Sequence, residues 1–577
     1  MSRLSNVSRF AAALLTLYPV FVMPIAASVA SHEVMNDASP ATDQRVRQAL
    51  SRLTFGARPG DVERVSKMGV DKFIAEQLDP DSIDDTAVQQ RLSKLSTLNL
   101  DAPDLAAQYN PPKPTPTPTP APGAGMGMDP KTAMTMTTEA PMPTPAASMS
   151  PTATPKPTPP PKNPGMVVNE LQRAKLLRAV YSERQLYEVM VDFWENHFSI
   201  FANKDADRWL LTGFDRDSIR PFALGRFRDL LGATAHSPAM LFYLDNWQSS
   251  VRRDIPATKD KPARSYGGIN ENYARELMEL HTLGVEGGYS QKDVQEVARC
   301  FTGWTIRKPN EEGIFVFNPN AHDNGEKVVL GQRIPAGGGI ADGERVLDIL
   351  AKSPATAKFV TTKLARRFLG DDPPPAVIAR ASQVFLSTDG SIAETVKAII
   401  TSKEFSAPAA YQNKVKTPFE YVASTLRATA AETDGNSPVL NWIARMGQPV
   451  YGRVTPDGYP DRTTEWLSNN DLLARLNFAS ALVQNQIKGT SVNVGKLLPD
   501  DGSPIDNVVA VILEGRATAP TRKELEKINS EHANSSPPTT IPVVATVSGP
   551  GSPAPPKIDP RAELVALALG SPEFQHK

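Results

Sequence analysis

The sequence is poor in several features that usually narrow a protein's class. It has one cysteine, Cys300, among 577 residues, so no disulfide can form within the chain. Its net charge of -1 gives no reason to expect nucleic acid as a partner or binding to a membrane surface. No HExxH zinc motif is present. The folded part must therefore depend on its core, and Cys300, beside Phe301 in a helical pattern, is predicted to be a buried structural cysteine.

Long apolar runs are also absent, except at the N-terminus. Arg3 and Arg9 precede the apolar run 10–27. The tripeptide SVA (28–30) follows it and has the small-x-small form that signal peptidase accepts. The two prolines and the short length of the run argue against a retained membrane span. We expect residues 1–30 to be a cleaved signal peptide, the mature chain to begin near Ser31, and the protein to reach the periplasm or the cell surface. An uncleaved tether is the alternative.

Proline, by contrast, is abundant, and its 53 residues are concentrated in a few places. Two regions contain almost no large apolar residue and cannot bury a core, so they are predicted to be disordered. The expected order is a signal peptide (1–30), an N-terminal helical part (31–109), a Pro/Thr-rich disordered insertion (110–164), a main helical body (165–498), a low-complexity segment (499–560) and a C-terminal helix (561–577).

The remaining sequence predicts an all-α, multi-helix globular body with a minor β-hairpin. Apolar residues recur at helical spacing, and capping-box pairs such as Ser290 with Asp293 and Thr417 with Glu420 mark helix starts. The only strand-like runs are 314–317 and 328–330, which we expect to pair with each other around a turn that presents His322 and Asp323.

Two helices carry a histidine on an apolar face beside a face rich in carboxylates. In 271–283, which is followed by a glycine turn and a second helix, Glu271, Arg275 and Glu279 form a ladder, and His281 is predicted to point inward. A ladder of this kind is also typical of a solvated surface. In the segment RQLYEVMVDFWENHF, Glu188, Asp192, Glu195 and Asn196 share one side, and His197 lies among apolar residues.

Several long stretches resemble the bacterial family known as domain of unknown function 1800. They are RLTFGARPGD, VDFWENHF, RDLLGATAHSPAMLFYLDN, NENYARELMELHTLGV, VARCFTGWTI, the His322-Asp323 turn, VKTPFEYV and MGQPVYGRVTPDGYP. The resemblance runs from about Val46 to Lys488 and returns in the final helix, and the Pro-rich segments depart from it. It implies export and a mostly helical fold but no established reaction. Members are often encoded beside another exported family, domain of unknown function 1501, which is similar to sulfatases.

Two hypotheses of different class follow. In the first, the protein is an exported enzyme or metal-binding protein with a site in its helical core. Imidazole and carboxylate ligands suit a divalent metal such as Zn, Fe or Mn, and a carboxylate can act as general base. No pair has a diagnostic zinc spacing, so ligands must come from different segments. The candidate metal ligands are His197, His236, His281 and His322; the candidate catalytic residues are Glu276, Glu279, His281 and Asp323, with Asp245 as a further carboxylate.

In the second hypothesis, the protein is a non-catalytic periplasmic or cell-surface partner that binds or matures the co-encoded exported protein of the domain of unknown function 1501 family. Its buried histidines would then be structural, bonded to carboxylates within a large helical core.

Overall fold

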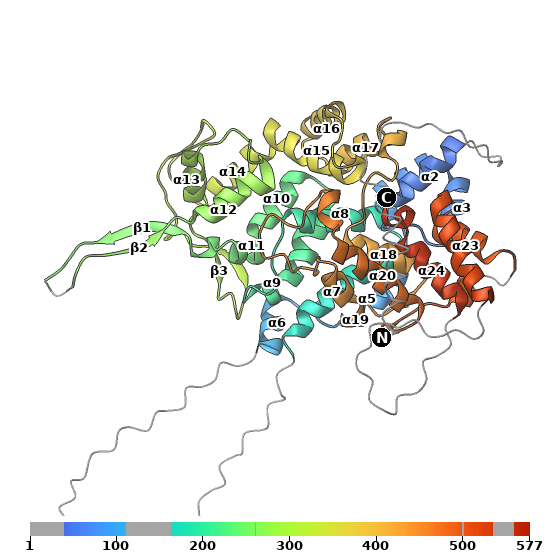
Figure 1. The fold of residues 1–577 in the computed structure, drawn as a ribbon. Coiled ribbons are helices and arrows are strands. Elements are labelled where there is room, and N and C mark those ends of the chain that lie inside the picture. Colours follow the sequence, from blue (N-terminus) through green and yellow to red (C-terminus); the bar gives the residue numbers. More distant parts are fainter. Residues whose placement is uncertain (1–39, 111–162, 260, 499–500, 535–558) are drawn as a thin grey trace, which may run out of the picture.

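The computed structural model describes residues 40–110, 163–259, 261–498, 501–534 and 559–577 (Figure 1). The predicted signal peptide and most of the predicted Pro/Thr-rich insertion lie outside these residues. So does part of the predicted low-complexity segment, although 501–534 is described and contains two helices, α22 and α23.

Helices dominate the described residues, as predicted. The N-terminal half contains α2 (Pro40–Leu53), α3 (Asp61–Met68), α4 (Val70–Leu78), α5 (Thr86–Leu92), α6 (Ala102–Tyr109), α7 (Gly165–Tyr181), α8 (Gln185–His197), α9 (Asp207–Gly213), α10 (Phe227–His236), α11 (Pro238–Tyr243), α12 (Glu271–Glu276) and α13 (Gln291–Cys300). The C-terminal half contains α14 (Ala341–Ala351), α15 (Pro354–Leu369), α16 (Pro375–Ser387), α17 (Ile392–Ile400), α18 (Pro418–Ala428), α19 (Ser437–Arg445), α20 (Asn469–Val483), α21 (Val494–Leu497), α22 (Pro504–Ile512), α23 (Ala519–Asn534), α24 (Pro560–Gly570) and α25 (Pro572–Gln575).

The strands form small two-stranded antiparallel sheets. They pair as β1 (Ser250–Ile255) with β2 (Arg264–Gly268), β3 (Trp304–Arg307) with β4 (Ile314–Phe317), β5 (Lys327–Val329) with β6 (Gln332–Ile334), and β7 (Glu432–Thr433) with β8 (Thr490–Ser491). The predicted pairing of 314–317 with 328–330 is wrong, although both runs are strands. Leu330 and Gly331, with φ of 49° and 76°, instead turn β5 tightly back into β6.

The helix signals in the sequence were more reliable than the strand signals. Both predicted capping boxes form, one from Ser290 and Asp293 at α13 and one from Thr417 and Glu420 at α18. The predicted helix 271–283 begins at Asn270, whose side chain accepts a hydrogen bond from the backbone N–H of Asn272. From Leu277 to Thr282 it continues as a π-helical turn, a form that local sequence signals do not mark.

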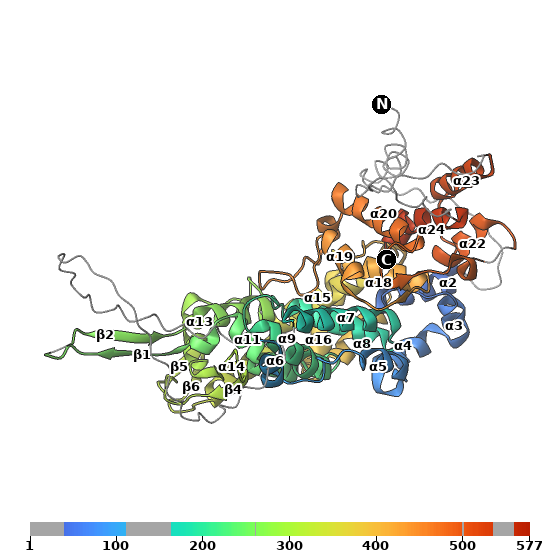
Figure 2. The same cartoon turned by 90° about the horizontal axis from the view of Figure 1, so that it is seen from below.

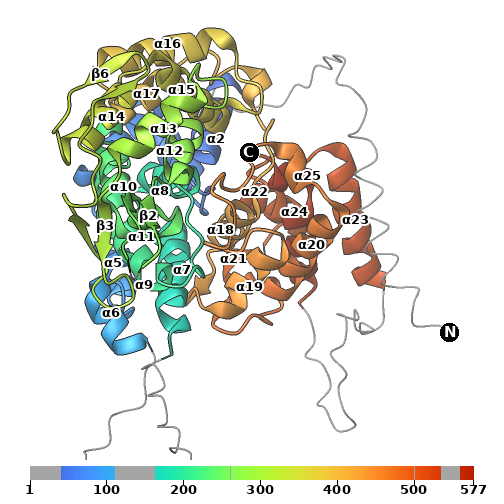
Figure 3. The same cartoon turned by 90° about the vertical axis from the view of Figure 1, so that its left-hand side faces the viewer.

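The helices gather into two lobes that share one hydrophobic core. In Figures 2 and 3, α18–α25 lie together on one side and α7–α17 on the other, so we refer to the helices α18–α25 as the C-terminal lobe. Helix α7 packs against α18 and α19 across the junction. Within the described ranges, no helix combines the length and the apolar character needed to cross a bilayer. The junction brings together helices that are distant in sequence, and it contains the cleft described next.

Candidate functional site

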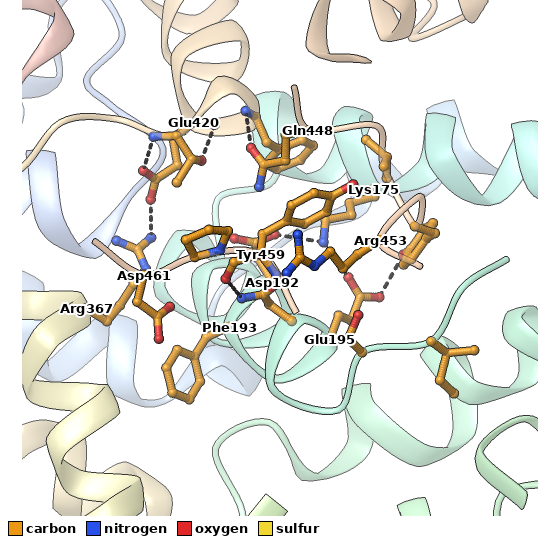
Figure 4. Close-up of a pocket in the computed structure, with 18 of the residues that line it drawn as sticks. Lys175, Asp192, Phe193, Glu195, Arg367, Glu420, Gln448, Arg453, Tyr459 and Asp461 are labelled. Atoms are coloured by element: carbon orange, nitrogen blue, oxygen red, sulfur yellow. Dashed lines mark hydrogen bonds and ion pairs between the residues drawn. The ribbon is translucent and has the colours of Figure 1, made fainter. Parts of the chain in front are cut away.

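A charged cleft lies where the two lobes meet (Figure 4). Its cavity volume is about 80 Å³, and it is lined from α7, α8, α15, the start of α18 and the segment 448–461. Phe193, Phe419, Tyr451 and Tyr459 supply aromatic surface among the charged side chains. Concave sites with a few convergent polar groups are the usual location of ligand sites. We call this feature the junction cleft.

A lysine and two carboxylates form one wall of the junction cleft. Lys175 of α7 lies 2.7 Å from Asp192 and 2.7 Å from Glu195, which face it from neighbouring turns of α8. The side chain of Glu195 is 3% exposed and that of Lys175 is 14% exposed. Burial alone would lower the pKa of Lys175, but the two carboxylates raise it above its ordinary value, so the lysine stays charged.

Glu195 is the residue in this wall that can gain or lose a proton near neutral pH. Tyr451 donates a hydrogen bond to Oε1 at 2.7 Å, and Lys175 donates to Oε2 at 2.7 Å. Burial raises the pKa of Glu195 to about 7, against the pull of Lys175 and with a further rise from the nearby charge of Asp215. Arg220 and Arg178 hold Asp215 ionised and lower its pKa despite its burial. Of the two neighbouring carboxyls, Glu195 is therefore the one that takes up a proton.

The segment 448–461 closes over this wall because α8 binds it directly. Asn196 accepts a hydrogen bond from the backbone N–H of Tyr459 at 2.7 Å and donates one to the carbonyl oxygen of Tyr459 at 2.9 Å. Gly458, with φ of 74°, passes so close that an added Cβ would lie 2.2 Å from the carbonyl oxygen of Asn196. Tyr451, which bonds to Glu195, also has a positive φ of 55°. Strained backbone of this kind is concentrated at ligand-binding and catalytic sites.

The opposite wall of the cleft is rich in cations. Arg367 of α15 lies 2.8 Å from Glu420, and Lys577 forms an ion pair with the same carboxylate. Burial opposes the charge on Glu420, but Arg367 and Lys577 hold its pKa well below its ordinary range. Lys414 lies 3.1 Å from Asp371, and burial lowers the pKa of this lysine.

The predicted histidines do not come together as one set. His197 and His281 are neighbours: Nε2 of His197 lies 3.0 Å from the carbonyl oxygen of His281, and the ring centroids are 6.3 Å apart. Both are 2% exposed, so the prediction that His281 points inward is confirmed. Burial, followed by the charge of Lys363, lowers the pKa of His281 to about 3 and that of His197 well below its ordinary value. The two imidazoles are therefore neutral at pH 7.

The other two histidines have local partners elsewhere. His236 bonds to the carbonyl oxygen of Gly232 and lies 2.9 Å from Glu344. His322 bonds to the carbonyl oxygen of Thr302 and lies 3.1 Å from Asp342. Among the described residues, no group of three or more His, Cys, Asp or Glu side chains is arranged to hold a metal ion. The four histidines thus do not form the single ligand set that the sequence suggested, because His197 and His281 contact each other while His236 and His322 pair with Glu344 and Asp342.

The predicted catalytic carboxylates are also dispersed. Asp323 pairs with Arg299 at 2.8 Å, which lowers its pKa against the effect of partial burial. Glu279 accepts a hydrogen bond from Tyr289 at 3.4 Å, and burial together with Glu279 raises the pKa of Glu276. Neither Glu276 nor Glu279 lines the junction cleft.

Two further residues singled out in the sequence have local partners as well. Asp245 pairs with Lys204 at 2.8 Å. Cys300 is buried as predicted, and burial raises its pKa to about 12. Neither residue lines the junction cleft.

The residues of the junction cleft were visible in the sequence but were not recognised as a site. The stretches VDFWENHF, VKTPFEYV and MGQPVYGRVTPDGYP, on which the family resemblance rests, supply Glu195, Glu420 and Tyr451 to the same cleft. The polar face of α8 that contains Asp192, Glu195 and Asn196 was the available signal. Local periodicity could not identify the residues that pack on that face, because Tyr451 and Tyr459 are 256 and 263 residues distant from their partners Glu195 and Asn196 in the chain.

These features define a mostly helical protein with a charged, aromatic-lined cleft between two lobes. A family model described as "Protein of unknown function (DUF1800)" matches residues 48–576, nearly the whole described chain. The protein therefore belongs to this family, and the resemblance inferred from the motifs is confirmed. Neither the comparison with curated proteins nor the comparison with solved structures returned a match.

Proposed function

We propose that the protein is an exported enzyme that performs acid–base chemistry on a polar ligand in the junction cleft, with Glu195 as the proton-transferring group. The observation that carries the proposal is the buried Glu195, whose pKa is raised to about 7, at the wall of the cleft. A carboxyl that titrates near the working pH can both accept and release a proton. Lys175 and Tyr451 fix its two oxygens, so its orientation is set before a ligand arrives.

The neutral, buried pair His197 and His281 is the competing location for chemistry. Their low pKa values keep both rings in one charge state over the pH range in which Glu195 changes its own. The cleft therefore supports proton transfer at neutral pH better than the histidine pair does.

The test is a panel of polar substrates, including sugars, esters and amides, assayed with purified mature protein. Activity found in the wild type should fall at least 100-fold in Glu195→Gln, since removal of a positioned acid–base typically costs a factor of roughly 10² to 10⁴. Glu276→Gln is the matched control, because burial also raises the pKa of Glu276 but this residue lies outside the cleft. Activity that survives in Glu195→Gln and is lost in Glu276→Gln would contradict the proposal.

A second candidate function, partner binding, is favoured by the β1–β2 arm, which extends away from the body in Figures 1 and 2. Opposed residues of an antiparallel pair share a face, so the pairs Arg253–Tyr266 and Ile255–Arg264 present one cationic and apolar surface. Tyr266 is 51% exposed and Ile255 is 42% exposed. Arginine, tyrosine and large aliphatic side chains are typical of binding surfaces. We propose that this arm binds an acidic surface of the co-encoded domain of unknown function 1501 protein.

Capture of that protein on immobilised wild-type chain tests the arm. The double variant Ile255→Ser with Tyr266→Ser should weaken capture at least tenfold. Val285→Ser is the control, since Val285 is equally apolar and 72% exposed but lies outside the arm. Equal capture by all three proteins would exclude the arm as the docking surface.

A further inference from the structure

The far wall of the junction cleft contains more buried positive than negative charge. Lys414 and Lys577 are 4% and 3% exposed, and the side chain of Arg367 is 10% exposed. The nearby Arg52 of α2, which does not itself line the cleft, is fully buried. The carboxylates paired with these four cations among the described residues are Glu420, which serves Arg367 and Lys577, and Asp371, which serves Lys414. Asp461, also at this wall, lies 3.8 Å from another lysine, Lys363.

Two of these arginines also have unused hydrogen-bond donors. Nη1 of Arg367, a residue that lines the cleft, is buried and has no hydrogen-bond partner among the described residues. Nε and Nη1 of Arg52 are in the same condition, while Nη2 of Arg52 donates to the carbonyl oxygen of Ala410. Buried guanidinium donors are normally satisfied, because leaving a charged donor without a partner is costly.

The cleft lining as a whole also contains more positive than negative side chains. Five cations line the cleft, namely Lys175, Arg367, Lys414, Arg453 and Lys577, against four carboxylates, namely Asp192, Glu195, Glu420 and Asp461. A proton on Glu195 increases this positive excess. The lining therefore attracts an anion rather than a cation.

We propose that the Arg367 wall of the junction cleft is an oxyanion subsite, which binds a carboxylate, phosphate or sulfate group of the same ligand on which Glu195 acts. This rests on the proposed function for the identity of the ligand. The planar guanidinium of Arg367 suits an oxyanion because its donors match two oxygens at once, and Lys414 and Lys577 add positive charge. Substrates of the enzyme are then polar acids or phosphate or sulfate esters rather than neutral molecules.

The subsite predicts that anion binding takes up protons. Burial, followed by the charge of Arg367, holds the pKa of Lys577 well below its ordinary value, and burial lowers the pKa of Lys414. Lys577 faces Arg52 of α2, Arg367 of α15 and Glu420 of α18, so two cations and one carboxylate act on its pKa. A bound anion raises the pKa of both lysines, because it favours their charged forms.

Isothermal titration calorimetry of the mature protein with sodium sulfate, phosphate and acetate at low ionic strength tests the subsite. We expect saturable binding of at least one of these anions, with proton uptake seen as a dependence of the heat on buffer ionisation enthalpy. Arg367→Gln should weaken binding at least tenfold, and Arg367→Lys, which keeps the charge without the planar fork, should weaken it less. The anion that binds most tightly identifies the class of ligand group.

Controls separate this inference from the proposed function. Arg228→Gln should bind anions as the wild type does, since Arg228 is likewise an ion-paired arginine, bonded to Glu344 and Asp348, but lies outside the cleft. Glu195→Gln should keep anion binding while losing activity. Undiminished anion binding by folded Arg367→Gln would overturn the subsite and leave the role of Glu195 standing, whereas retained activity in Glu195→Gln would overturn the role of Glu195.

Discussion

The charge of Glu195 is set by competition between burial and its neighbours. Lys175 favours the ionised form of Glu195, but it also pairs with Asp192, and both carboxylates lie 2.7 Å from its amine. Asp215 retains its own charge because Arg220 and Arg178 face it. Burial then decides the outcome and raises the pKa of Glu195 to about 7. One carboxyl in a crowded ionic network is thereby left to titrate near neutrality.

This shift has a defined effect on stability. The folded state holds the proton of Glu195 more tightly than the unfolded state, so this group lowers the free energy of unfolding as pH rises from about 4.5 to about 7. Glu195→Gln should remove that decline. The difference in free energy of unfolding between wild type and variant should change by up to about 3 kcal/mol between these two pH values. The change is smaller if part of the proton resides on Asp215. Urea unfolding at pH 4.5 and 7.5 measures it, and a constant difference would show that Glu195 has an ordinary pKa.

At the scale of elements, the cleft depends on the attachment of the segment 448–461 to α8. Asn196 holds Tyr459 through two backbone hydrogen bonds, and Gly458 fits beneath the carbonyl oxygen of Asn196 only because it has no side chain. This contact keeps Tyr451 and Tyr459 in the lining of the cleft, where Tyr451 bonds to Glu195.

Gly458→Ala should detach this segment and destabilise the protein by about 1 to 3 kcal/mol, through strain at φ of 74° together with a contact of 2.2 Å. Gly447→Ala is the matched control, because φ there is 93° but the nearest atom to an added Cβ is 4.0 Å away. Thermal unfolding of the two variants compares them. Equal losses would mean that backbone strain alone accounts for the effect and that the contact with Asn196 does not matter.

Sequence patterns predicted the helical elements well because their signals are local. Capping pairs such as Ser290 with Asp293 act within one turn, and the mostly helical fold follows from them and from apolar periodicity. Strand pairing failed for 314–317 because its partner, 304–307, was not recognised as a strand in the sequence. The cleft could not be predicted in the same way, since Glu195 and Tyr451 meet only after the lobes have packed.

At the scale of the whole molecule, we expect the two-lobed protein to be exported. The predicted signal lies outside the described residues, and its cleavage site follows from the sequence alone. N-terminal sequencing of protein recovered from the periplasm or cell surface should begin near Ser31. A chain that retains Met1 would favour the tethered alternative and would place the junction cleft at a membrane surface.

The central claim is that Glu195 in the junction cleft, rather than His197, His281 or the carboxylates Glu276 and Glu279, is the group that exchanges protons with a ligand at neutral pH. The most direct test is a ¹³C NMR titration of glutamate side-chain carboxyls in the mature protein, in Glu195→Gln and in Glu276→Gln. The account predicts one carboxyl that titrates near pH 7, absent from Glu195→Gln and retained in Glu276→Gln. Loss of that resonance in Glu276→Gln instead, or no glutamate that titrates above about pH 6, would contradict it.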